Sequence, residues 1–189
     1  RDTLTAIEGL GKMGPATTDP ATRLLQLELL AGLGQAADVL RLGPQSLQGV
    51  PFAAADRVRV GLLIARAHLV LEQVDPAIAL VEAGIPGADA PDLLRLREEI
   101  AQALQRKGDL ATALTWMVDI LGQTPERDPA FARRYLRRVE IEFLANPELR
   151  LTSLQRLQEK EALFTASDAP ADVRKQYDEL KRLIGGSRG

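Results

Sequence analysis

Apolar residues recur every three or four positions along most of the chain, which is the spacing of helices that bury one face. No segment shows the alternation of apolar and polar residues that is typical of a half-buried strand. Proline, glycine and Asn-Pro interrupt the pattern at short intervals. The sequence therefore predicts an all-α fold of about ten helices, in which short connections make successive helices antiparallel.

The breaks in the pattern set the expected extent of each helix. We expect helices over residues 2–12, 20–31, 35–42, 52–73, 91–107, 109–121, 129–145, 152–164 and 169–184, and one that begins at Asp75. Asp19 is a predicted N-cap ahead of Pro20, and Asp75 is one ahead of Pro76. Gly43 and Pro44 should end the third helix.

Two stretches of the chain share like residues 34 positions apart. The first stretch has Ala67, Val70, Asp75, Ala77, Ala79 and Leu80, and the second has Ala101, Leu104, Asp109, Ala111, Ala113 and Leu114. A fixed period of this length is typical of stacked helical hairpins, each of which buries its apolar face on the next.

Within the second stretch, small residues lie where paired helices would touch and Gly108 lies at the turn. The residues concerned are Ile100, Ala101, Leu104, Gly108, Ala113, Met117, Ile120 and Pro125. With them, residues 94–127 resemble the tetratricopeptide repeat, and residues 60–93 match at Ala67, Val70, Ala79 and Ala83. The resemblance implies a right-handed α-solenoid that forms one domain over residues 1–189. Residues 60–93 and 94–127 would be its best repeats, and residues 2–43 and 129–184 its degenerate hairpins.

In this family the first helix of each hairpin usually lines a concave face that binds a partner. The resemblance places on that face His68, Glu72, Arg95, Glu98, Gln102, Gln105 and Arg106. It implies a non-catalytic scaffold for a partner protein or peptide. The alternative is a structural subunit of a bacterial envelope-associated assembly, with homo-oligomer formation left open.

Charge and composition narrow the functional classes. The 24 basic and 26 acidic residues give a net charge of −2, which argues against a general nucleic-acid binder. The absence of cysteine excludes disulfides and thiolate metal sites, and a lone histidine cannot form an ordinary transition-metal site. We find no catalytic constellation, so we expect no enzyme, cofactor or metal. We expect His68 to be a partly exposed residue that pairs with Glu72.

A second candidate surface is basic. Arg133, Arg134, Arg137 and Arg138 form two i, i+4 pairs that could hold an acidic partner or a phosphate. Glu126, Asp128, Glu140 and Glu142 lie nearby in the sequence, so a salt-bridged, solvated face is the favoured interpretation.

No run of residues is long and apolar enough for a membrane span. The chain begins with Arg1 rather than Met, which suggests a processed form or an excised fragment. The basic residues are mostly arginine, as in proteins of GC-rich bacterial genomes, and bacterial periplasm and cytoplasm are both compatible with the composition.

Overall fold

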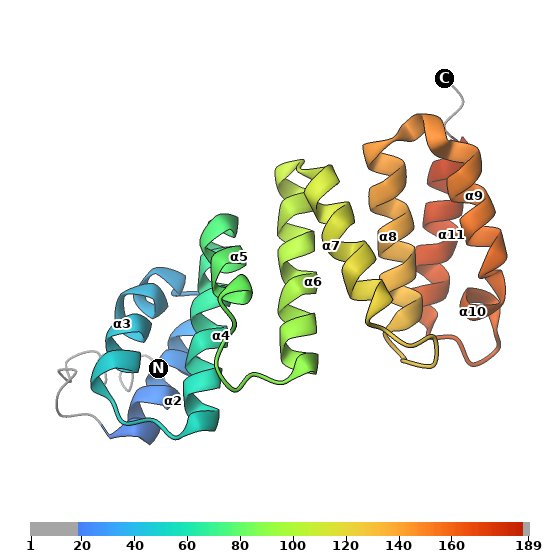
Figure 1. The fold of residues 1–189 in the computed structure, drawn as a ribbon. Coiled ribbons are helices and arrows are strands. Elements are labelled where there is room, and N and C mark those ends of the chain that lie inside the picture. Colours follow the sequence, from blue (N-terminus) through green and yellow to red (C-terminus); the bar gives the residue numbers. More distant parts are fainter. Residues whose placement is uncertain (1–18, 187–189) are drawn as a thin grey trace. The chain divides into compact units, whose positions relative to one another are not determined.

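The computed structural model describes residues 19–186. Ten α-helices and one short 3-10 helix make up this part of the chain, which contains no strand (Figure 1). The prediction of an all-α fold is therefore confirmed. The helix expected over residues 2–12 lies outside the described residues.

The chain divides into two compact units, Arg1–Ala103 and Leu104–Gly189. Unit 1 contains α2 (Pro20–Gly32), α3 (Ala36–Gly49), α4 (Ala54–Val70), α5 (Val74–Glu82) and most of α6 (Ala90–Lys107). Unit 2 contains the end of α6, then α7 (Leu110–Gly122), α8 (Phe131–Ala145), η2 (Pro147–Leu149), α9 (Arg150–Glu159), α10 (Glu161–Thr165) and α11 (Ala171–Gly186).

In unit 1, α3 and α4 each pack against α2, and α4 also packs against α3 and α5. The predicted cap of α2 is confirmed, because the side chain of Asp19 accepts hydrogen bonds from the backbone N–H groups of Ala21 and Thr22. Aliphatic side chains fill the core in two clusters. Their buried members are Leu24, Leu27, Leu30, Ala36, Val39, Val50, Phe52, Val60, Ile64 and Ala67.

Helix α3 corrects one prediction. It continues through Gly43 and Pro44 to Gly49, where the sequence predicted an end at Leu42. Proline removes one backbone donor from a helix. However, Gly43 before Pro44 and Ser46 after it are both buried, so the packed face of α3 continues past the proline. The Ser46 hydroxyl also donates to the carbonyl of Leu42 at 2.6 Å. Packing against α4 therefore outweighs the local signal to stop.

Helix α5 corrects the prediction that Asp75 is its N-cap. It begins at Val74, so Asp75 lies inside its first turn, and no side chain caps the helix. The turn before it is closed by Glu72, whose φ of 58° is left-handed, and by a hydrogen bond from the backbone N–H of Gln73 to the carbonyl of His68. The same arrangement ends α6, where Gly108 has a φ of 83° and Asp109 N–H donates to Leu104.

These two turns are 36 residues apart, and burial follows the same spacing. Ala77 and Ala113 are both fully buried, and their neighbours one turn on, Val81 and Met117, are buried as well. The predicted spacing of 34 pairs residues that differ in burial, because it matches Val70, which is 63% exposed, with buried Leu104. It also matches exposed Ala79 with buried Ala113. The sequence identities thus pair residues that face different environments.

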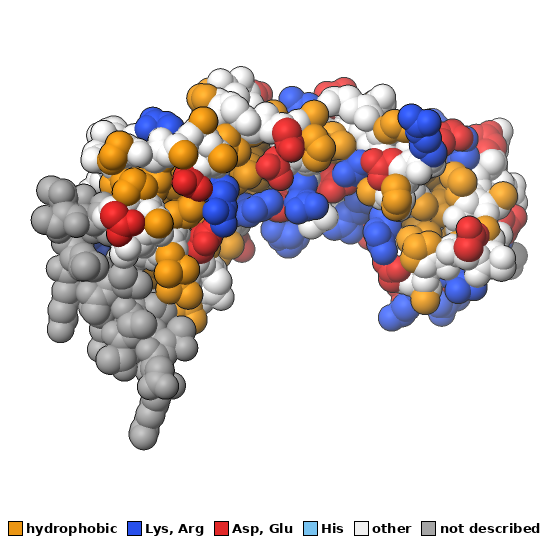
Figure 2. Space-filling view, turned by 90° about the horizontal axis from the view of Figure 1, so that it is seen from below, with side chains coloured by type: hydrophobic (Ala, Val, Ile, Leu, Met, Phe, Trp, Pro, Cys, Tyr) orange, Lys and Arg blue, Asp and Glu red, His pale blue; other side chains and the backbone are white. Residues whose placement is uncertain are grey.

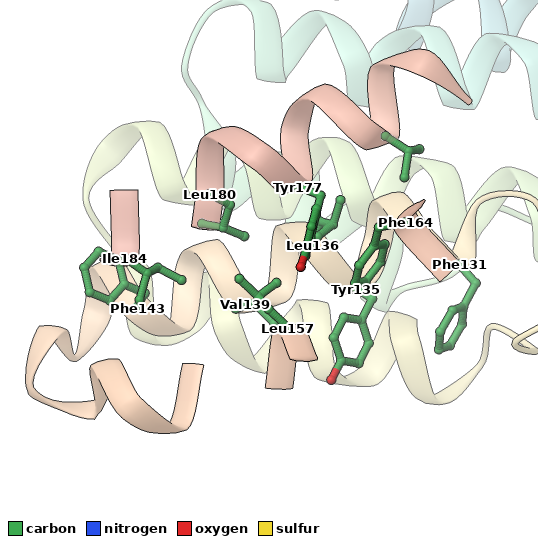
Figure 3. Packing of buried hydrophobic residues seen from close by; sticks show 11 residues of the cluster. Phe131, Tyr135, Leu136, Val139, Phe143, Leu157, Phe164, Tyr177, Leu180 and Ile184 are labelled. Atoms are coloured by element: carbon green, nitrogen blue, oxygen red, sulfur yellow. The ribbon is translucent and has the colours of Figure 1, made fainter. Parts of the chain in front are cut away.

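In unit 2, α8, α9 and α11 pack on one another around the largest described core cluster (Figure 3). Four of its five aromatic rings form a continuous row. The centroid separations are 6.0 Å for Phe131 and Tyr135, 6.1 Å for Tyr135 and Phe164, and 5.2 Å for Phe164 and Tyr177. These are favourable distances for aromatic pairs. Helix α8 also packs against α7.

The single helix expected over residues 152–164 is two helices, α9 and α10, separated at Lys160. Lys160 leaves the helical conformation and forms an ion pair with Glu126. After this break, Phe164 is fully buried in the core and Glu161 accepts a hydrogen bond from Tyr177 at 2.6 Å. Contacts with residues distant in the sequence therefore favour the break.

Candidate functional site

The predicted partner-binding residues of α6 lie on the side opposite its buried positions. Leu96, Ile100 and Ala103 are buried, whereas Arg95 and Gln102 are exposed. Glu98 is half-buried on the same helix. The helix begins where the Asp89 side chain accepts from the backbone N–H of Asp92 at 2.8 Å. It therefore presents an extended polar surface, in keeping with its amphipathic sequence.

Arg95 and Gln102 form no hydrogen bond or ion pair within the described residues of the chain. Their spacing of seven residues places them on one face of α6. Arg106, four residues after Gln102, is also exposed, and Gln105 beside it is half-buried; both belong to unit 2. We call the surface formed by Arg95 and Gln102 in unit 1 the α6 face.

His68 lies near the end of α4 and is half-buried. Its Nδ1 is 2.8 Å from Oε1 of Gln73, so the expected pairing with Glu72 is wrong. The left-handed turn at Glu72 explains the difference, because it brings Gln73 back to the last turn of α4 while Glu72 is exposed.

One ion pair connects α4 to α6 within unit 1. Nε of Arg66 lies 3.1 Å from both carboxylate oxygens of Glu99, and both side chains are about one-third exposed. Arg66 precedes His68 by two residues and Glu99 follows Glu98. The structure thus links the two helices next to predicted site residues, through a pair that the sequence prediction did not include.

The four arginines of α8 are engaged in ion pairs. Arg133 Nε lies 2.7 Å from Asp172 of α11, and Arg137 lies 2.9 Å from Glu140. Arg134 lies 3.6 Å from Asp128, and Arg138 lies 4.0 Å from Glu142. Arg156 also forms an ion pair with Glu142, at 3.1 Å. The structure therefore favours the salt-bridged interpretation of this basic surface.

Asp172 is the partner that the sequence did not reveal, because it lies on another helix. The hydrogen bond from Arg133 lowers the pKa of the Asp172 carboxyl below its ordinary value. Glu126, which was expected near the arginines, instead pairs with Lys160.

Sequence reasoning missed a groove between α8 and α11. It has a volume of about 250 Å³ and is lined by Glu140 of α8 and by Gln176, Glu179, Leu180 and Leu183 of α11. The four α11 residues follow the i, i+3, i+4, i+7 spacing of one helix face. That spacing is visible in the sequence, but only the packing of α11 beside α8 shows that a groove results.

None of the helices in the described part of the chain is both long and apolar enough to cross a bilayer. Residues 19–186 also contain no group of three or more His, Asp or Glu side chains arranged to hold a metal ion.

Comparison of the chain with protein-family models, with curated proteins and with solved structures finds no match.

Proposed function

We propose that this chain is a non-catalytic interaction scaffold that binds a partner protein or peptide through the α6 face. The proposal includes the tetratricopeptide-like stacking of helical hairpins that the sequence suggests. The equivalence of two turns and their flanking buried residues at a spacing of 36 supports a hairpin repeat, although the period differs from the one expected.

One observation carries the proposal. Arg95 and Gln102 are long, exposed side chains without a partner among residues 19–186, whereas the arginines of α8 are paired with carboxylates. Guanidinium and amide groups that are not used inside a fold can donate to carboxylates and backbone carbonyls of a ligand. The α6 face therefore favours a partner segment that carries acidic side chains.

A peptide selection tests this function. A random peptide library is selected on the intact chain and depleted on the double variant Arg95→Ala/Gln102→Ala. We expect enriched peptides to carry Asp or Glu and to bind the double variant about tenfold or more weakly in calorimetric titrations, because charged hydrogen bonds are lost.

The matched control is Arg174→Ala/Gln158→Ala, which removes one exposed arginine and one exposed glutamine from α11 and α9. It should bind the selected peptides as the parent chain does. Equal binding to both double variants would show that the α6 face is not the binding surface. Loss of the helical circular dichroism signal in Arg95→Ala/Gln102→Ala would also contradict its assignment as an outward face.

A further inference from the structure

Ion pairs connect three helices of unit 1 along one surface. Arg59 of α4 pairs with Glu28 of α2, and Arg66 of α4 pairs with Glu99 of α6. Arg59 and Arg66 are seven residues apart, so they lie on the same face of α4. Figure 2 shows acidic and basic side chains next to one another over the helices of unit 1. This face of α4 therefore borders α2 on one side and α6 on the other.

The pair of Arg66 and Glu99 shows which residues of α4 and α6 are neighbours. Helix α5 returns along α4, and the loop after it leads to the start of α6, so α4 and α6 run in the same direction (Figure 1). Val70 follows Arg66 by four residues and Gln102 follows Glu99 by three. Both therefore lie one turn beyond the ion pair, on the faces that carry it. Val70 thus borders the α6 face on the side of Gln102.

Three different kinds of side chain meet on this surface. Arg95 is a cation without a partner among residues 19–186, and Gln102 is an amide that can both donate and accept hydrogen bonds. Val70 is 63% exposed, which makes it the most exposed of the large apolar residues in the described part of unit 1. One ligand can therefore meet all three with a carboxylate, a backbone amide group and an apolar side chain.

The amide of Gln102 favours an extended ligand. Backbone N–H and C=O groups in the middle of a helix bond to one another, whereas those of an extended segment are free to bind a side-chain amide. Arg95 and Gln102 are seven residues apart, which is about 10 Å along the axis of α6. Val70 lies on the neighbouring helix, so its distance from Arg95 is larger. An extended segment rises about 3.3 Å per residue and places every second side chain on one side, so residues four apart span the required distance.

We infer that Val70 is the apolar recognition residue of the proposed binding surface, and that the partner is an extended segment with an acidic and an apolar side chain four residues apart. The acidic side chain pairs with Arg95, the backbone between the two bonds to Gln102, and the apolar side chain packs on Val70. The inference rests on the proposed function and extends its site from α6 to α4. Because Arg66 and Glu99 neutralise each other, the surface favours one acidic residue beside an apolar one over a run of acidic residues.

The test is a titration of the full chain, followed by nuclear magnetic resonance, with peptides on a glycine–serine background. They carry Asp and Leu four residues apart, in either order, and matched peptides carry Ser in place of Leu or Lys in place of Asp. We expect one order of Asp and Leu to shift the backbone amide resonances of Arg95, Gln102 and Val70. Val70→Ser and the Ser-for-Leu peptide should each weaken binding about fivefold, and both changes together should weaken it no more than either alone. Val118→Ser, at an exposed valine of α7, should not change binding.

Equal binding of the Lys peptide, or binding that Val70→Ser leaves unchanged, would contradict the inference. So would absence of binding to every peptide of the set, or tighter binding of an alanine-based helical peptide with Asp and Leu seven residues apart. Self-association of the chain that Val70→Ser abolishes would assign the surface to a second copy and overturn the inference as well. The library selection with Arg95→Ala/Gln102→Ala decides the proposed function separately, because it involves no change at Val70.

Discussion

At the scale of single residues, the best-defined polar cluster of unit 2 joins α10 to α11. The hydroxyl of Tyr177 donates to Glu161 Oε1 at 2.6 Å, and Nζ of Lys181 lies 3.0 Å from both of these oxygens. The hydrogen bond from Tyr177 is the largest cause that lowers the pKa of Glu161 below its ordinary value of 4.5, and Lys181 lowers it further. The carboxylate form of Glu161 is therefore favoured in the folded chain.

This cluster predicts a pH dependence of stability. A carboxyl group whose pKa is lower in the folded state stabilises the fold above its unfolded pKa, and this contribution is lost as pH falls through the folded pKa. We expect Tyr177→Phe to lose less free energy of unfolding than the parent chain between about pH 6 and about pH 3. Urea denaturation at both pH values measures the two losses.

Tyr135→Phe is the matched control, because the Tyr135 hydroxyl donates to the backbone carbonyl of Arg156 rather than to a carboxylate. Its pH dependence should equal that of the parent chain. Parallel acid-induced losses in all three proteins would show that the Tyr177 hydrogen bond does not set the pKa of Glu161.

Residue contacts were predictable from the sequence only when both partners lie within one regular turn. The cap at Asp19 depends on local geometry, so its sequence signal was sufficient. His68 pairs with Gln73 because Glu72 adopts a left-handed conformation, which is uncommon for glutamate and carries no sequence signal. Arg133 and Asp172 are 39 residues apart, so only the packing of α8 on α11 brings them together.

At the scale of elements, α3 shows how packing overrides a local helix breaker. A Cβ atom added to Gly43 would lie 2.7 Å from Cγ1 of Ile64, a core residue of α4. Gly43 is therefore the position that lets α3 approach α4 closely, in addition to being a poor helix former. Its role at this interface is steric.

We expect Gly43→Ala to lower the free energy of unfolding by about 1–2 kcal/mol, since overpacking outweighs the gain in helix propensity. Chemical denaturation monitored by circular dichroism measures the change. Gly32→Ala, near the end of α2, is the control, because a Cβ there meets no atom within 4 Å. A stabilised Gly43→Ala variant would show that Ile64 moves without cost.

The same reasoning explains which element boundaries the sequence could predict. Hydrophobic periodicity placed α2, α6, α7 and α8 within a few residues, because one apolar face runs along each helix. It failed at Lys160, where a contact with Glu126 and burial of Phe164 favour a break. It also paired residues of different burial at a spacing of 34, since alanines occur on both buried and exposed faces.

At the scale of the whole molecule, the described core clusters respect the division into two units. Those around Leu27 and Val39 belong to unit 1, and the aromatic cluster around Leu157 belongs to unit 2. Chains built from successive hairpins often open in parts, because each element depends mainly on its neighbours. Separate cores therefore predict separate local stabilities.

Leu27 is fully buried in unit 1, so Leu27→Ala should cost about 2–5 kcal/mol in that unit. We expect native-state hydrogen exchange to show faster exchange in α2, α3 and α4, with protection of α8, α9 and α11 retained. Leu157→Ala, at an equally buried position of unit 2, should give the reverse pattern. If either substitution lowered protection in both units equally, the chain would unfold as one cooperative body, and the two clusters would share a single free energy of unfolding.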